Sequence, residues 1–302
     1  MTEKIPTLKP DTFKKLLMAD IDHFQLDKPH FNDFYIHDLS KTSYRLKLPL
    51  PPHRKTVNDF ILVTSGSMTK SAGVDIYEVT ENSIFLLPAG QITSTTKISY
   101  DFQGFYVHFS NSFISESKSQ IDILKQFPFL EWLNNPVSQF TNSDKEILTT
   151  LLKRLENIYT ESSNYELIKI YLLTFLTELK FIFTKSAISK TSASERLAYE
   201  FKHSLTKHIK KEHEAEYYAK QLSVSPNHLN KCIKEVFGKS ASQTISEYLI
   251  LEAKVLLHQP SISISEISFS IGFDDPSYFG RFFKKHTGYT PKEFRKMIDL
   301  SD

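Results

Sequence analysis

The spacing of apolar residues changes once along this chain, near residue 112, and the change limits the folds that the chain can adopt. Before it, short apolar runs alternate with turn residues. Phe60-Ile61-Leu62-Val63 precedes Ser65-Gly66-Ser67, and Ile84-Phe85-Leu86-Leu87 precedes Pro88-Ala89-Gly90. Runs of this kind that recur at intervals of roughly 10–15 residues predict short strands in a small sandwich or barrel. Residues 1–110 are therefore expected to be mostly β.

Residues 112–183 follow the three- and four-residue steps of helices instead. The first helical stripe contains Ile147, Leu148, Leu151, Leu152, Leu155 and Ile158. A second helix follows, and its apolar residues between Leu167 and Phe183 extend beyond one stripe. Such a helix buries more than one face. It packs either on the β-domain and on a second copy of the chain, or wholly inside the core of one chain.

Residues 184–195 are small, polar and without periodicity, which is typical of a linker. Beyond them every pattern is helical. We therefore expect an α+β chain of three parts. Residues 1–183 form a β-rich domain with helices at about 112–183, residues 184–195 form the linker, and residues 196–302 form an all-α domain.

The composition excludes several classes of protein. Lys and Arg number 37 against 35 Asp and Glu in 302 residues, so the net charge of +2 rules out a uniformly basic nucleic-acid coat but permits a basic face. The single cysteine, Cys232, allows no intrachain disulfide and fits a reducing cytosol. The N-terminus lacks the apolar core of a secretory signal, and polar residues interrupt the longest apolar-rich stretch. We expect a cytoplasmic protein without a membrane span, associated with the nucleoid when it binds DNA.

Two helix-turn-helix units can be read in the all-α domain, at about 214–237 and 263–287. In the first, Glu214 to Leu222 is helical and Ser223-Val224-Ser225 is the turn. The second helix begins at Pro226 and stops before Gly238. Serine is a favoured N-cap, proline suits the first helical position, and glycine ends helices.

The second unit repeats this scheme. Ser263 to Ile271 is helical, Gly272-Phe273-Asp274-Asp275 is the turn, and the next helix begins at Pro276 and ends before Gly288. Asp275 is the expected N-cap. Between the units, Ser242 to Leu257 is predicted to be one helix, which at ~1.5 Å per residue is roughly 24 Å long. A connector of this length can hold two helices about one turn of DNA apart, on the order of 34 Å.

A helix that reads DNA needs a buried face, amides or guanidiniums for base edges, and lysines for phosphates. The second helix of each unit has all three. The outward polar residues that we expect to contact DNA are Asn227, Asn230, Lys231, Lys234, Ser277, Arg281, Lys284 and Lys285. An exposed, solvated helix surface is the alternative for each residue taken alone.

Residues 215–295 resemble the DNA-binding domain of the AraC-type (AraC/XylS) family of bacterial transcription regulators. The first unit matches through Ala219-x-x-Leu222-x-x-Ser225-x-x-x-Leu229 and Lys234-x-x-x-Gly238, and the connector through Glu252-Ala253-Lys254-x-Leu256-Leu257. The second matches through Ile264-x-Glu266-Ile267-x-x-x-Ile271-Gly272-Phe273-Asp274-Asp275-x-Ser277-Tyr278-Phe279-x-Arg281-x-Phe283-Lys284-Lys285-x-x-Gly288-x-Thr290-Pro291-x-x-Phe294-Arg295. This last stretch is long and highly specific.

The resemblance implies a sequence-specific transcription regulator, more often an activator, that reads two adjacent major-groove segments per chain. It places Asn227, Asn230 and Lys231 toward bases and Lys234 toward phosphate. Ser277 and Arg281 would approach bases or the nearby backbone, and Lys284 the phosphates. The implied N-terminal domain is a cupin-like β-barrel that binds a small effector, dimerises, or both. The implied partners are double-stranded DNA, a second copy of the chain, a small-molecule effector and RNA polymerase.

Two other functions stay open on the sequence alone. The first is a metal-dependent cupin enzyme that carries a DNA-binding domain, for which several histidines and a carboxylate would have to converge. His53 is followed by Arg54 and Lys55, and His108 stands alone on a predicted strand, so we expect satisfied or surface histidines, no metal, no cofactor and no enzyme. The second is a nonspecific DNA-packaging protein, which would bind any duplex equally at fixed salt.

Overall fold

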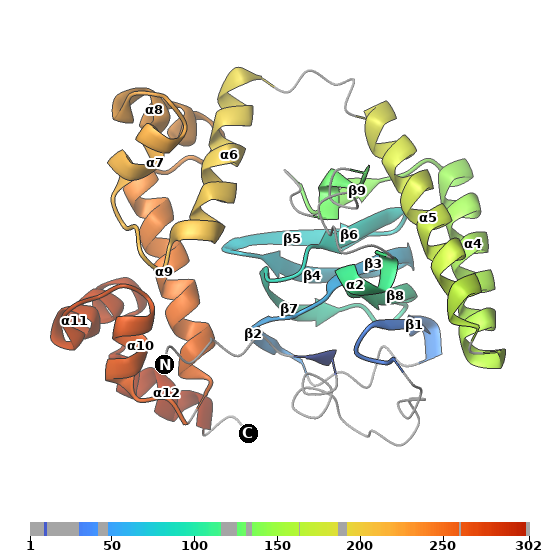
Figure 1. The fold of residues 1–302 in the computed structure, drawn as a ribbon. Helices are drawn as coiled ribbons and strands as arrows, with labels where there is room; N and C mark the ends of the chain where they lie inside the picture. Colours follow the sequence, from blue (N-terminus) through green and yellow to red (C-terminus); the bar gives the residue numbers. More distant parts are fainter. Residues whose placement is uncertain are drawn as a thin grey trace. The chain divides into compact units, whose positions relative to one another are not determined.

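The computed structural model describes residues 9–10, 30–41, 48–115, 126–130, 135–162, 164–186, 192–259 and 261–299. The chain divides into two compact units, and each is described by itself (Figure 1). The N-terminal unit is Thr7–Ser189, and the C-terminal unit contains Lys190–Asp302.

Nine strands form two sheets in the described part of the N-terminal unit. They are β1 (Phe34–Asp38), β2 (Leu50–Arg54), β3 (Asn58–Ser65), β4 (Ser67–Ala72), β5 (Asp75–Thr80), β6 (Ser83–Leu87), β7 (Ile92–Ile98), β8 (Gln103–Phe109) and β9 (Val137–Gln139). One sheet has the order β1-β8-β3-β6-β9 and the other the order β2-β7-β4-β5. Neighbouring strands are antiparallel throughout both sheets. The expected α+β fold is confirmed, and its β part is a pair of sheets without closure into a barrel among the described residues.

The five-stranded sheet has two buried faces, because successive residues of a strand point to opposite sides. In β3, Phe60 and Leu62 belong to the core under the helices, whereas Ile61 and Val63 belong to a second core with residues of the other sheet. Strands buried on both faces read as continuous apolar runs, which is why β3 and β6 were recognisable in the sequence.

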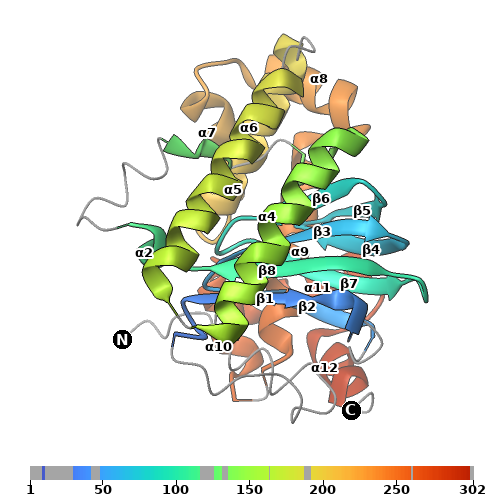
Figure 2. The same ribbon diagram turned by 90° about the vertical axis from the view of Figure 1, so that its right-hand side faces the viewer.

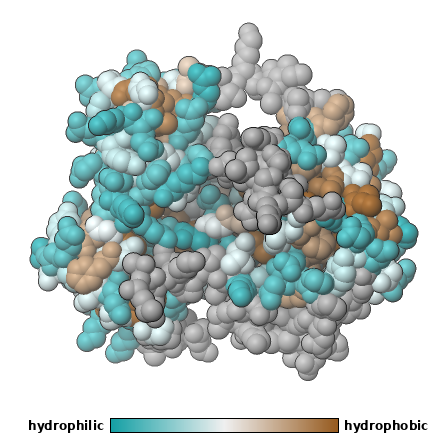
Figure 3. All heavy atoms as spheres, viewed as in Figure 1, coloured by the Kyte–Doolittle hydropathy of each residue, from teal (hydrophilic) through white to brown (hydrophobic). Residues whose placement is uncertain are grey.

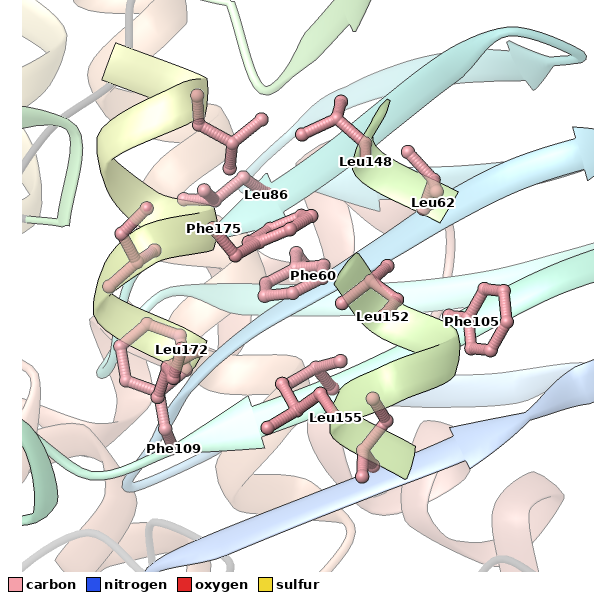
Figure 4. Packing of buried hydrophobic residues seen from close by; sticks show 14 of the residues in the cluster. Phe60, Leu62, Leu86, Phe105, Phe109, Leu148, Leu152, Leu155, Leu172 and Phe175 are labelled. Atoms are coloured by element: carbon pink, nitrogen blue, oxygen red, sulfur yellow. The ribbon is translucent and has the colours of Figure 1, made fainter. Parts of the chain in front are cut away.

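Two long helices cover one face of the five-stranded sheet. Helix α4 (Asn142–Glu161) begins with a capping box between Thr141 and Asp144, and α5 (Tyr165–Ser186) lies beside it (Figures 1 and 2). Figure 4 shows the packing between these helices and the sheet. The labelled side chains are Leu148, Leu152 and Leu155 of α4, Leu172 and Phe175 of α5, and Phe60, Leu62, Leu86, Phe105 and Phe109 of the sheet. The Phe60 and Phe175 rings are stacked with their centroids 4.7 Å apart.

Short elements complete the N-terminal unit: η1 (Leu39–Lys41), α2 (Asn111–Ile114) and η3 (Pro128–Leu130). The C-terminal unit is helical. Its helices are α6 (Ala193–His208), α7 (Ala215–Gln221), α8 (Pro226–Phe237), α9 (Ala241–Leu257), α10 (Ile264–Ser270), α11 (Pro276–Thr287) and α12 (Pro291–Asp299). No helix in the described part of the chain combines the length and the apolar character that crossing a membrane requires.

Candidate nucleic-acid interface

The C-terminal unit contains the same pair of helices twice. Helices α7 and α10 each have 7 residues, and the helices that follow them, α8 and α11, each have 12. Both longer helices carry proline in the first turn and end at a glycine in the left-handed conformation, Gly238 with φ 70° and Gly288 with φ 83°. The two units predicted from the sequence are therefore built with the same local chemistry.

Helix α8 is fixed by its cap and by one apolar face. The Ser225 hydroxyl accepts a hydrogen bond from the backbone N–H of His228 at 3.2 Å, which satisfies one of the free donors at the helix start. Leu229, Cys232 and Ile233 are buried and pack the helix into the domain. The opposite face is left to solvent.

Helix α11 is held in the same way by aromatic residues. The Asp275 carboxylate accepts from the backbone N–H of Ser277 at 2.8 Å, as the sequence predicted for the N-cap. Phe279 and Phe283 are fully buried. Phe273, from the turn before the helix, lies against Phe279 and Phe282 with ring centroids 5.4 and 5.2 Å away. The turn and the helix are thus packed as one rigid piece.

The turn between α10 and α11 needs glycine at position 272. Gly272 has φ +85°, and a Cβ built on it would lie 2.5 Å from the carbonyl oxygen of Lys210. His213 completes this contact, because its Nε2 lies 2.9 Å from the carbonyl oxygen of Ile271. The sequence pattern did not indicate His213, which lies in an irregular segment without periodicity.

Helix α9 connects the two helix-turn-helix pairs of the C-terminal unit and is buried on most sides. Its buried residues are Ala241, Thr244, Ile245, Tyr248, Leu249, Ile250, Glu252, Ala253, Val255, Leu256 and Leu257. It packs against α7 and α8 of the first helix-turn-helix pair and against α10 and α11 of the second pair. Both candidate reading helices are therefore positioned by one shared 17-residue element.

The predicted DNA-contacting residues of α8 do not all have the same surroundings. Asn227, Lys231 and Lys234 are exposed. Asn230 is half-buried, and its Oδ1 accepts a hydrogen bond from the backbone N–H of Ala241 at 3.0 Å. Asn230 therefore links α8 to the start of α9, and this oxygen is engaged within the protein.

The predicted residues of α11, namely Ser277, Arg281, Lys284 and Lys285, are all exposed. The Arg281 guanidinium lies 3.9 Å from Asp275 Oδ2, and its centre lies 5.9 Å from the centroid of the Tyr278 ring. The two charged side chains are 70% and 57% exposed, so this ion pair contributes little and does not hold the arginine away from a ligand.

The alternative of a metal site in the N-terminal unit depends on His53 and His108. Both are buried. His53 Nδ1 lies 2.8 Å from the carbonyl oxygen of Pro51, and His108 Nε2 lies 2.7 Å from that of Phe31. Among the described residues, no group of three or more His, Cys, Asp or Glu side chains is arranged to hold a metal ion.

The paired helices and their common connector define the class of this C-terminal unit: it is a helix-turn-helix domain that contains the motif twice. A family model described as a helix-turn-helix domain matches residues 218–297. This match supports the expected resemblance of the C-terminal unit to AraC-type transcription regulators.

Three relatives illustrate this similarity. The chain is 30% identical over 121 residues to the uncharacterized HTH-type transcriptional regulator YisR of Bacillus subtilis, which covers 40% of this chain and 42% of YisR. It is 26% identical to the lactose operon transcription activator of Staphylococcus xylosus over 80% of this chain and 84% of that protein. It is 36% identical to the arabinose operon regulatory protein of Salmonella typhimurium over 26% of this chain and 27% of that protein. The match thus spans less than half of YisR and of the arabinose regulator.

Proposed function

We propose that this protein is a sequence-specific transcription regulator that places α8 and α11 in two adjacent segments of the DNA major groove. The observation that supports this most strongly is the repetition in the C-terminal unit. Two 12-residue helices share a cap, a buried face and a glycine stop, and both pack on α9. A single reading helix would need only one such unit.

The exposed side chains supply the two kinds of contact that specific binding needs. Asn227 and Lys231 of α8 and Ser277 and Arg281 of α11 are assigned to base edges, and Lys234, Lys284 and Lys285 to phosphates. Asn230 joins the base contacts only if its amide nitrogen, rather than the engaged oxygen, faces the DNA. Its proposed contact is therefore a single donated hydrogen bond, not the two-point contact to adenine that asparagine can make.

We propose further that two chains associate through α5. Ile170 and Phe181 of α5 are 58% and 59% exposed although they are large and apolar, and they lie three helical turns apart on one face. Ile147 of α4 is also exposed. In Figure 3, hydrophobic side chains reach the surface on the side that carries α4 and α5. Exposed apolar residues gathered on one face favour a protein–protein contact.

Activation is the expected direction of control. The lactose operon relative, which aligns with 80% of this chain, is named a transcription activator. For an activator that works on DNA, contact with RNA polymerase is part of the proposal, as is a small-molecule effector bound by the N-terminal unit. The effector would shift the population of conformations in which the reading helices are available.

The test is selection of bound duplexes from a random pool by the purified full chain, followed by affinity measurements on the selected and a scrambled duplex at several salt concentrations. We expect tight binding of the selected duplex and much weaker binding of the scrambled one, with affinity falling as salt rises. Equal affinity for both duplexes at every salt concentration would indicate a nonspecific DNA-binding protein and overturn the proposal.

A further inference from the structure

The inner face of the four-stranded sheet is polar where a protein core is usually apolar. Lys70 of β4 pairs in register with Thr95 of β7, and Thr93 of β7 pairs with His53 of β2. All four residues are buried, and Lys70 is only 4% exposed. Met68, two residues before Lys70 and so on the same face of β4, belongs to the apolar core between the sheets. The Lys70 side chain therefore enters the interior.

The inner face of the opposite sheet is polar at the matching place. Asp59 of β3 pairs in register with His108 of β8, and Tyr106 lies two residues away on the same face of β8. Lys55, which follows β2, forms a buried ion pair with Asp59 and lies 3.3 Å from the Tyr106 hydroxyl. That hydroxyl lies 3.2 Å from His108 Nδ1. We call these residues, with Lys70 and Thr95, the inner polar strip.

The charges of the inner polar strip do not balance. Lys55 and Lys70 are buried amines, and Asp59 is the buried carboxylate that the described residues place beside them. The Lys55 amine donates a hydrogen bond to Asp59 Oδ2. The other carboxylate oxygen, Oδ1, has no hydrogen-bond partner among the described residues. The Lys70 amine has Thr95 Oγ1 at 3.4 Å and the centroid of the Phe85 ring at 5.4 Å. Neither contact brings a full negative charge.

Burial has consequences for the protonation of this cluster. It lowers the pKa of Lys70 to about 7, with Lys55 adding to the effect and Asp59 opposing it. It also lowers the pKa of His108 to about 4 and raises that of Tyr106, so both are neutral at pH 7. A buried ammonium without a counterion is costly, and an anion beside it would restore the charged form.

We infer that the inner polar strip is the binding site for a small hydroxylated organic anion, whose carboxylate or phosphate lies against Lys70 and one of whose hydroxyls donates to Asp59 Oδ1. The inference names the chemical class of the effector and so rests on the proposed function. Lys70 supplies the charge that attracts the anion. Thr95 and the Tyr106 hydroxyl supply neutral hydrogen-bonding partners for the rest of the molecule.

The test compares the wild-type full chain with K70M by calorimetric titration and thermal unfolding. The probes are gluconate for the carboxylate arm, glucose 6-phosphate for the phosphate arm, inorganic phosphate as the bare ion, and glucose as the neutral relative. Methionine keeps the length of the side chain and removes the amine. K97M, which alters an exposed lysine of β7, is the matched control.

We expect at least one organic anion to bind the wild type and K97M, glucose to bind at least tenfold more weakly, and K70M to lose at least tenfold in affinity for the anion. Titrations at pH 8 in buffers of different ionisation enthalpy should show proton uptake on binding to the wild type and none in K70M, because the anion returns Lys70 to its charged form. If no anion binds, if glucose binds as well as the anions, or if K70M binds like the wild type, the inference fails.

The inference and the proposed function can fail separately. Affinity for the selected duplex without any probe should be the same in K70M as in the wild type, because Lys70 lies in the other unit. Anion binding that depends on Lys70, in a chain that selects no duplex, would leave the anion site in place and refute the DNA-binding proposal. If the chain binds a selected duplex specifically but none of the anions, the DNA-binding proposal stands and the anion site is refuted.

Discussion

Arg281 lies on the exposed face of α11, and its neighbours in the protein hold it only weakly. It rests near Asp275 and over the Tyr278 ring, and both contacts are exposed to solvent. Moving it from these neighbours to a guanine therefore costs little, whereas the bidentate contact with guanine is among the stronger base contacts. In Asn230, in contrast, the side-chain oxygen already accepts a hydrogen bond from the backbone N–H of Ala241.

The R281A variant should lose about 1–3 kcal/mol of binding free energy on the selected duplex if Arg281 reads a guanine. Its affinity for the scrambled duplex should fall much less, because base readout is absent there. Fluorescence anisotropy titrations of both duplexes measure the difference. K292A, which alters an exposed lysine of α12, is the control and should bind like the wild type. Unchanged affinity of R281A for the selected duplex would remove Arg281 from the base contacts.

A comparison of Gly272 with Gly288 separates two costs of adding a side chain, namely backbone strain and a steric clash with a neighbouring backbone oxygen. Both have positive φ, but only Gly272 has a backbone oxygen in the place of a Cβ. G288A should cost roughly 1–2 kcal/mol of unfolding free energy from backbone strain alone, and G272A on the order of 3 kcal/mol or more because Lys210 must also move. Urea unfolding followed by circular dichroism compares them. Equal losses in the two variants would show that the contact with Lys210 is easily relieved.

At the scale of elements, local chemistry decides how much the sequence reveals. Helices α8 and α11 begin and end at the predicted residues because cap, proline and glycine act within a few positions of one another. Strands β4 and β7 were not predicted, since their inward residues include Lys70, Thr93 and Thr95 rather than an alternating apolar set. On β4 and β7, these inward polar residues removed the apolar pattern that would have predicted a strand. The contacts of His213 and Asn230 join segments that local patterns do not relate.

The exposed face of α5 carries a prediction at the same scale. I170K places a charge in the proposed contact between two chains and should turn a dimer into a monomer at micromolar concentration, as measured by analytical ultracentrifugation. The matched control is I76K, which changes an isoleucine of β5 that is 73% exposed. It should leave the dimer intact. A wild-type chain that sediments as a monomer with and without DNA would contradict the α5 contact.

At the scale of the whole molecule, the two units carry different kinds of chemistry. The N-terminal unit has the inner polar strip in its interior. The C-terminal unit, although it also buries Lys202 and Glu252, has its candidate DNA-contacting lysines and Arg281 on exposed helix faces. A fall in pH should therefore act mainly on the stability of the N-terminal unit, whereas a rise in salt concentration should act mainly on DNA binding by the C-terminal unit.

His108 makes the first half of this statement testable. Its pKa is lowered to about 4, mainly by burial and also by Lys55, against the opposing hydrogen bond to Phe31 and the charges of Asp59 and Asp33. The unfolded chain therefore binds more protons between about pH 4 and 6.5, so stability falls as the pH falls through this window. From pH 7 to pH 5 the histidine should account for about 2 kcal/mol of that loss. Urea unfolding at both values should show a loss smaller by this amount in H108Q, and an equal loss in both proteins would refute the assignment.

The central claim is that one chain reads two major-groove segments through two helices fixed on α9. It is tested most directly by inserting five base pairs, about half a helical turn, between the two conserved blocks of the selected duplex. Because α9 fixes α8 relative to α11, the insertion turns one block to the far side of the DNA. We predict that affinity falls nearly to that of a duplex with one block scrambled. Affinity equal to that of the uninterrupted duplex, or selection of a single block in the first place, would contradict the claim.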